Sequence, residues 1–143
     1  MITADLYTSF FEEALGDGVD ITGSGTIKVA LFDDSFSFDP THAAGADLTG
    51  EITNQDDYSQ AEVPNPAVTL NADNLPYQVN YDCDDVSFGA EVTISAYHAV
   101  FIDTGNDKPL FHIDYDGVQE AENGTFKLEI DPNGLFNLTT EAA

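Results

Sequence analysis

The chain has 143 residues, of which 27 are Asp or Glu, three are Lys and none is Arg, so its formal net charge is −24. This charge excludes nucleic acids and anionic membrane surfaces as partners, because both require a basic patch that three lysines cannot form. The single cysteine, Cys83, excludes an internal disulfide and a cysteine-rich zinc site.

The carboxylates are spread along the chain from Asp5 to Glu141 rather than gathered in an acidic tail. In ordinary salt such a surface repels itself and destabilises the folded state. At about 1 M salt the Debye length falls to about 3 Å and the repulsion is screened. We therefore favour a halophilic protein over an acidic mesophilic one, and we expect folding to require concentrated salt.

Residues 1–18 are predicted to form a short N-terminal helix. An apolar stripe near the helical period marks this helix and consists of Leu6, Phe10 and Phe11. The stripe either packs on the protein's own sheets or anchors the protein in an assembly, because it is too large to stay in water without cost. These three residues are therefore candidate assembly contacts.

Short apolar segments follow, separated by Gly, Pro, Asn and Asp. The predicted strands are 26–32, 50–53, 61–70, 76–81, 85–88, 92–102, 110–115, 125–130 and 135–138, with turns at 103–107 and 131–134. This spacing predicts a mainly β fold, an antiparallel β-sandwich of about eight or nine strands with one short N-terminal helix. We assign one domain, residues 1–143, with the sandwich over 26–140. The core is predicted to contain Ile27, Val29, Leu31, Ile94, Val100, Phe126 and Leu128.

The acidic segment 33–50 is too long for a simple hairpin connection. We expect it to lie outside the sandwich and to offer a second candidate surface for assembly. Its candidate contacts are Asp39, Pro40 and His42.

Two histidines lie in predicted strands that could face each other, His98 and His112. Such a pair either binds a metal or, more commonly, consists of hydrogen-bonded polar residues on a half-buried sheet. Nucleophile motifs such as Gly-x-Ser-x-Gly are missing from the sequence. We predict no catalytic residue, no cofactor and no metal site, so the chain is expected not to be an enzyme.

An acidic turn, Asp82 to Asp85, contains three carboxylates and Cys83. Asp82, Asp84 and Asp85 either hold Ca²⁺ or form a solvated turn, and the turn is favoured because the EF-hand spacing is missing. No positive charge lies near Cys83 in the sequence, so we expect its thiol not to be activated.

A series of short motifs runs from one end of the chain to the other. In order, these motifs are Tyr7-Thr8-Ser9-Phe10, Thr26-Ile27-Lys28-Val29-Ala30-Leu31, Asp39-Pro40-Thr41-His42, Glu51-Ile52, Asp84-Asp85-Val86, Thr93-Ile94-Ser95-Ala96, Ala99-Val100, Asp103-Thr104-Gly105, Pro109-Leu110, Gly124-Thr125-Phe126 and Asp131-Pro132-Asn133-Gly134-Leu135. The ordered set resembles small virion structural proteins of tailed bacteriophages, a family that includes capsid decoration proteins. The family's Gly-Tyr and Gly-Gly stretch is replaced here by Ala61–Pro66. The resemblance therefore does not define the shape of the central edge of the fold.

The resemblance implies a non-enzymatic virion protein without cofactors. It favours a decoration protein that stabilises the capsid lattice, binds the major capsid protein or other virion proteins, and forms homo-oligomers. The protein would be located in the virion, which is assembled in the host cytoplasm. Together with the acidic composition, the resemblance implies a tailed virus of a haloarchaeon as its source. The alternatives are a tail, head–tail connector or host-attachment component, and a halophilic ligand-binding or enzymatic β-sandwich.

Overall fold

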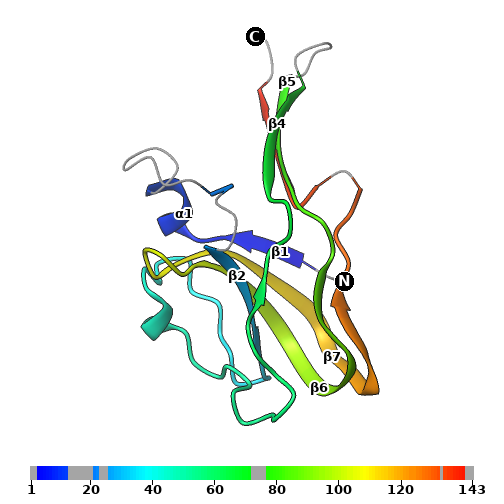
Figure 1. The fold of residues 1–143 in the computed structure, drawn as a ribbon. Coiled ribbons are helices and arrows are strands. Elements are labelled where there is room, and N and C mark those ends of the chain that lie inside the picture. Colours follow the sequence, from blue (N-terminus) through cyan, green and yellow to red (C-terminus); the bar gives the residue numbers. More distant parts are fainter. Residues whose placement is uncertain (1–2, 13–20, 23–25, 72–76, 133, 141–143) are drawn as a thin grey trace.

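The computed structural model describes residues 3–12, 21–22, 26–71, 77–132 and 134–140. Its strands form two antiparallel sheets (Figure 1). The larger sheet has the order β1-β7-β6-β2-β3 and contains β1 (Thr3–Leu6), β2 (Ile27–Phe32), β3 (Ala61–Glu62), β6 (Val86–Asp103) and β7 (Lys108–Leu128). The smaller sheet has the order β4-β5-β8 and contains β4 (Ala67–Asn71), β5 (Tyr77–Asp82) and β8 (Phe136–Thr140). The described residues also form one α-helix, α1 (Thr8–Glu12), and a single 3-10 turn, Gly45–Asp47. The prediction of a mainly β, sandwich-like fold with a short helix is confirmed.

The N-terminal segment differs from the prediction. Thr3–Leu6 form strand β1, which pairs with β7 in a register that places Leu6 opposite Phe111. The helix is confined to Thr8–Glu12, and the predicted helical residues 13–18 lie outside the described residues. Tertiary context overrides helical periodicity here, because the free edge of β7 offers the backbone of β1 a row of hydrogen-bonding partners.

Strands β6 and β7 form one long hairpin. The predicted strands between 85 and 102 fuse into β6, and those between 110 and 130 fuse into β7. Their pairing register shifts at five places. Such bulges bend a strand without ending it, and Gly89 and Gly117, with φ values of +133° and +134°, adopt the backbone conformations that favour glycine. The glycines that predicted strand ends are therefore bends within continuous strands.

Two predicted turns are confirmed. At the tip of the hairpin, Asp103 Oδ1 accepts a hydrogen bond from the backbone N–H of Gly105 at 2.9 Å. Before β8, the backbone N–H of Gly134 donates to the carbonyl of Asp131 at 2.8 Å, and Asn133 lies outside the described residues. The predicted strand 50–53 is reduced to one bridge between Glu51 and Phe32.

Both faces of the larger sheet are buried around β2 and the adjoining parts of β6 and β7. One face carries most of the predicted core residues, namely Ile27, Val29, Leu31, Ile94, Phe126 and Leu128. Val100 is also fully buried, but it belongs to a second cluster, together with Ala30 and Phe32 of β2. Since side chains alternate along a strand, this second cluster lies on the opposite face of the sheet from Ile27, Val29 and Leu31.

Segment 33–50 covers that second face. The ring of Phe36 is 6% exposed and its centroid lies 4.7 Å from that of Phe32. Phe38 and Leu48 pack against the same cluster. Our expectation that the segment lies wholly outside the sandwich is therefore wrong. The physical reason is that β2 carries Ala30 and Phe32 on its second face, and Phe36, Phe38 and Leu48 of the segment cover them.

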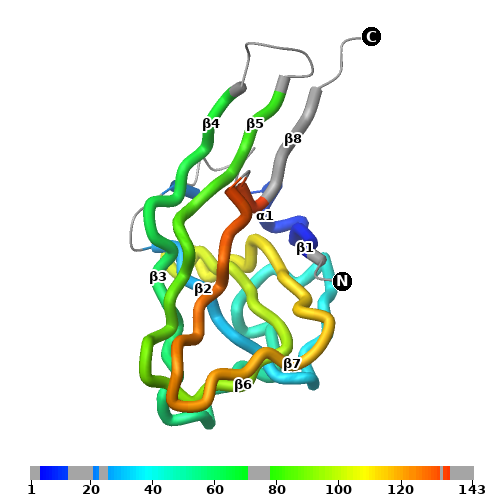
Figure 2. The backbone as a smooth tube through the Cα atoms, turned by 90° about the vertical axis from the view of Figure 1, so that its right-hand side faces the viewer, coloured from blue at the N-terminus to red at the C-terminus, as the bar shows by residue number. Residues whose placement is uncertain are grey.

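The smaller sheet projects from the rest of the molecule (Figures 1 and 2). We call β4, β5 and β8 the arm, and the remaining described residues the body. Tyr81 fixes the arm at its foot, because its side chain is 1% exposed and its ring centroid lies 5.1 Å from that of Phe111. Its hydroxyl donates to the carbonyl of Ile21 at 3.1 Å. The arm is thus anchored in the main core at one end.

Candidate functional site

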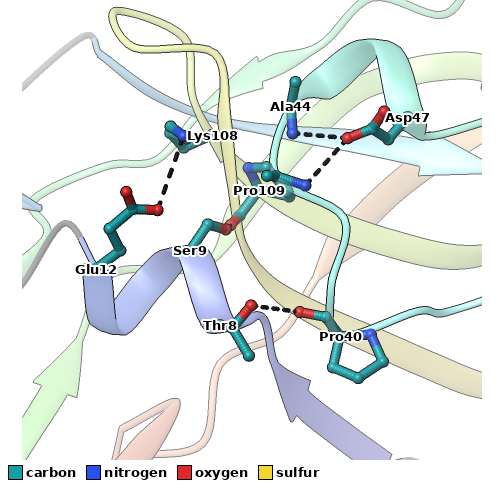
Figure 3. A network of polar contacts seen from close by, with 9 residues as sticks. Thr8, Ser9, Glu12, Pro40, Ala44, Asp47, Lys108 and Pro109 are labelled. Atoms are coloured by element: carbon teal, nitrogen blue, oxygen red, sulfur yellow. Dashed lines mark hydrogen bonds and ion pairs between the residues drawn. The ribbon is translucent and has the colours of Figure 1, made fainter.

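The helix α1 and segment 33–50, the two predicted assembly surfaces, meet at one end of the larger sheet (Figure 3). The backbone N–H and the hydroxyl of Thr8 both donate to the carbonyl of Pro40, at 2.9 and 2.8 Å. The buried hydroxyl of Ser9 donates to the carbonyl of Pro109 at 2.5 Å. We call the exposed surface of residues 8–12 and 39–42 the junction. These bonds hold its two halves in a fixed relation.

The apolar stripe of the N-terminus is divided between core and surface. Phe10 is 5% exposed and its ring centroid lies 5.0 Å from that of Phe111, whereas Leu6 is partly buried against the same core. Phe11 is 44% exposed. The stripe therefore packs mainly on the protein's own sheet, and Phe10 is corrected from a candidate contact to a core residue. Phe11 remains at the surface.

The three candidate contacts of the loop lie at or near the surface. Asp39 and Pro40 are exposed, and His42 is half-buried. The carboxylate of Asp39 accepts hydrogen bonds from the backbone N–H and the hydroxyl of Thr41, at 2.8 and 2.6 Å. These bonds, led by that of the hydroxyl, lower the pKa of Asp39. The outer side of the loop is thus ordered by its own polar groups and keeps a negative charge.

The two strand histidines are brought into contact. Nδ1 of His98 in β6 lies 3.1 Å from Nε2 of His112 in β7. Asp5 Oδ2 lies 3.6 Å from Nδ1 of His112, and Asp114 Oδ1 lies 3.8 Å from Nδ1 of His98. The ring of Phe38 stacks on that of His112, with centroids 4.9 Å apart and an interplanar angle of 12°. The two histidines are therefore a pair of polar residues packed against the aromatic rings of the second cluster.

Burial lowers the pKa of His112. This side chain is 3% exposed, and desolvation, followed by the neighbouring His98, lowers its pKa, while Asp5 and Asp114 oppose the shift. The 3.1 Å separation of Nδ1 of His98 and Nε2 of His112 fits one hydrogen bond, in which one nitrogen donates and the other accepts. Within the described ranges, no three His, Cys, Asp or Glu residues are grouped so that they could hold a metal ion.

The carboxylates of the acidic turn have separate partners. Asp82 Oδ1 accepts from the backbone N–H of Cys83 at 2.8 Å, and Asp84 Oδ2 accepts from the side-chain amide of Asn65 at 2.6 Å. Asp85 accepts from the backbone N–H of residue 130 at 2.8 Å, which is the main reason why its pKa is lowered. Asp82 therefore stabilises the turn itself, whereas Asp84 and Asp85 bind it to neighbouring segments of the chain. Burial raises the pKa of the Cys83 thiol to about 12, which agrees with the expected unactivated thiol.

A surface hollow of about 640 Å³ lies where the loop around residue 56 meets the hairpin. The side chain of Gln55 replaces a strand partner here, since it exchanges two hydrogen bonds with the backbone of Ser95, at 2.8 and 2.9 Å. Four carboxylates line the hollow, those of Asp56, Asp57, Glu120 and Glu122. Their charge would repel an anionic ligand.

The arm is the surface that the sequence interpretation missed. Residues 63–71, 77–81 and 134–140 contain no charged residue, although charged residues make up 21% of the chain. Val68 and Leu70 of β4 are 45% and 69% exposed. They lie opposite Tyr81 and Val79 of β5, whereas the polar Thr69 lies opposite Asn80. One face of the arm is therefore apolar and the other polar. The run of uncharged sequence was a usable signal for this surface.

Neither a protein-family model, nor a curated protein, nor a solved structure matches the chain. The resemblance to phage virion proteins therefore remains a prediction from short motifs. Among the described residues, no helix is long and apolar enough to cross a membrane.

Proposed function

We propose that the chain is a non-enzymatic structural protein of a virus particle, and that it acts as a capsid decoration protein in high salt. The observation that carries the proposal is the contrast between an acidic β-sheet body and an arm that has one partly apolar, uncharged face and a single strand carboxylate, Asp82, at its foot. Depletion of charge with exposure of large apolar side chains is typical of a surface that binds another protein.

The two surfaces divide the work of assembly in this proposal. The junction, with Phe11, Asp39 and Pro40 exposed and His42 beside them, binds the major capsid protein or another virion protein. The arm serves contacts between decoration subunits, so that the protein is a homo-oligomer on the lattice. The acidic body faces the brine. The hydrogen bonds from Thr8 to Pro40 support this role, because a preformed contact surface loses little conformational entropy on binding.

Quantification of the chain in purified particles tests the proposal. Particles of a haloarchaeal tailed virus that encodes this sequence would be purified in molar salt, and the copy number measured by quantitative mass spectrometry. Copies in the hundreds, together with density on the outer capsid lattice, support decoration. Absence from particles overturns the viral role. A few copies, or a few dozen, support a tail, connector or attachment component instead, and turnover or a tightly bound small molecule supports the ligand-binding alternative.

Substitution at the junction tests the proposed capsid contact. Phe11→Asp places a charge at the exposed apolar residue and should lower incorporation into particles at least tenfold while leaving the protein folded. The matched control is Val118→Asp, because Val118 is 41% exposed on β7 and lies outside the junction. Equal incorporation of both variants would show that the junction is not the capsid contact.

A further inference from the structure

One face of the arm is apolar, and its side chains on β4 are exposed. Leu70, the most exposed large apolar residue of the described chain, lies two positions from Val68 on the same side of β4. Val79 lies opposite Leu70 and is half-buried. At the foot of the arm this face continues into the core through Tyr81. The apolar face is thus an extension of the core beyond the body.

The charge distribution indicates that this face is covered in the working state. A sheet face exposed to brine is expected to carry charged residues in a chain with 27 acidic residues. The described strands of the arm carry one carboxylate, that of Asp82 at the end of β5, which lies opposite Ala67 on the polar face. The other face has exposed apolar side chains, those of Val68 and Leu70, and no charged residue. Exposed apolar side chains without charge point to a protein interface rather than to a brine-facing surface.

We infer that this face binds the same face of a second copy of the chain, so that two three-stranded sheets pack face to face about a two-fold axis. This inference rests on the homo-oligomer of the proposed function, but not on a location in a virion. Two bodies with a net charge of −24 each repel one another. The arms project away from the bodies (Figure 2), so their apolar faces can meet while the two bodies stay apart. An apolar face needs no complementary charge, and isologous pairing is the commonest symmetric solution.

The size of the face predicts a weak dimer. Strands of five residues at about 3.3 Å per residue, spaced about 4.8 Å apart, give a face of roughly 16 by 14 Å. Two such faces bury several hundred Å² of surface, below the roughly 1,200 Å² of a stable specific interface. We therefore expect a dissociation constant in the micromolar to millimolar range. Binding to a common lattice would raise the effective concentration of the arms and make the pairing efficient.

Sedimentation velocity in molar KCl, with protein from micromolar to millimolar concentration, measures this self-association. The test variant is Leu70→Asp and the matched control is Thr69→Asp, which adds the same charge to the next residue, on the polar face. An isologous dimer would bury two Leu70 side chains, one from each copy, and each contributes about tenfold in affinity. Leu70→Asp should therefore weaken association about a hundredfold or more, and Thr69→Asp by less than about threefold.

A second pair of variants tests the same contact without introducing a charge. Val68→Thr replaces a methyl group by a hydroxyl on the apolar face of the arm, and Val118→Thr does the same on β7 with similar exposure, 45% against 41%. Only Val68→Thr should weaken the dimer. Circular dichroism verifies that each variant is folded. A wild-type protein that stays monomeric to millimolar concentration overturns the inference, even if it binds another virion protein through the arm. Equal weakening by Leu70→Asp and Thr69→Asp also overturns it. Virion copy number is measured separately, so the two proposals fail independently.

Discussion

Replacement of Phe36 by Ala tests whether segment 33–50 is part of the core. The side chain is 6% exposed, and its ring centroid lies within 5.2 Å of those of Phe32, His98 and His112. Truncation of a buried Phe to Ala costs about 3–5 kcal/mol. We take about 3 kcal/mol, because a loop relaxes into the cavity more readily than a strand does. For a domain of this size that loss lowers Tm by roughly 10 °C.

Thermal unfolding followed by circular dichroism in molar KCl measures this change. Phe11→Ala is the matched control, since the same side chain is 44% exposed at the junction. It should lower the free energy of unfolding by less than about 1 kcal/mol. If Phe36→Ala melts within about 2 °C of the control, the loop is not a structural cover of the sheet. The same reasoning predicts that deletion of residues 35–45 unfolds the protein, whereas a segment outside the sandwich, as the sequence analysis expected, could be removed with the fold intact.

Three further predictions concern the folded state. Val100→Asp should prevent folding, because an unpaired carboxylate would be buried in the second cluster, and a soluble, cooperatively melting variant would contradict this. The pKa of His112 is lowered in the folded protein, so below about pH 6.5 the unfolded chain binds more protons than the folded one. The free energy of unfolding should therefore fall as pH drops below that value. The difference in Tm between pH 7 and pH 5.5 should be smaller in His112→Gln than in the wild type. Cys83, with a pKa of about 12, should react with a thiol reagent at pH 8 at least tenfold faster after unfolding in denaturant, and equal rates would place the thiol at the surface.

Period-two alternation was enough to predict most of the core. Ile27, Val29 and Leu31 lie on one face of β2, as their spacing requires. The pattern could not show that Ala30 and Phe32 on the other face are buried as well, since this depends on where Phe36 lies in space. A loop that covers a sheet leaves no periodic signal, because its apolar residues are spaced by the path of the loop and not by a regular backbone.

Pairing between strands that are distant in the sequence determines the elements that the sequence analysis predicted wrongly. The edge of β7 captures Thr3–Leu6 as a strand, although the apolar spacing there resembles a helix. The bulges at Gly89 and Gly117 look like strand ends because glycine is common to both. The contact between His98 and His112 was foreseeable from two facing strands. The apolar stripe of the N-terminus suggested an interface, but burial of Phe10 leaves only part of that stripe at the surface.

A rise in salt concentration should both stabilise the fold of the body and strengthen the pairing of two arms. Screening removes repulsion between carboxylates within the body, and it also removes repulsion between two bodies whose arms are paired. An interface held by ion pairs would weaken as salt rises, since the same screening reduces the attraction. Two of the three lysines form ion pairs within the described body, as Lys127 lies 3.2 Å from Asp85 and Lys108 lies 4.0 Å from Glu12. The uncharged apolar face of the arm is therefore the contact that such a chain can strengthen in brine, and self-association that increases with KCl would separate it from an ion-paired interface.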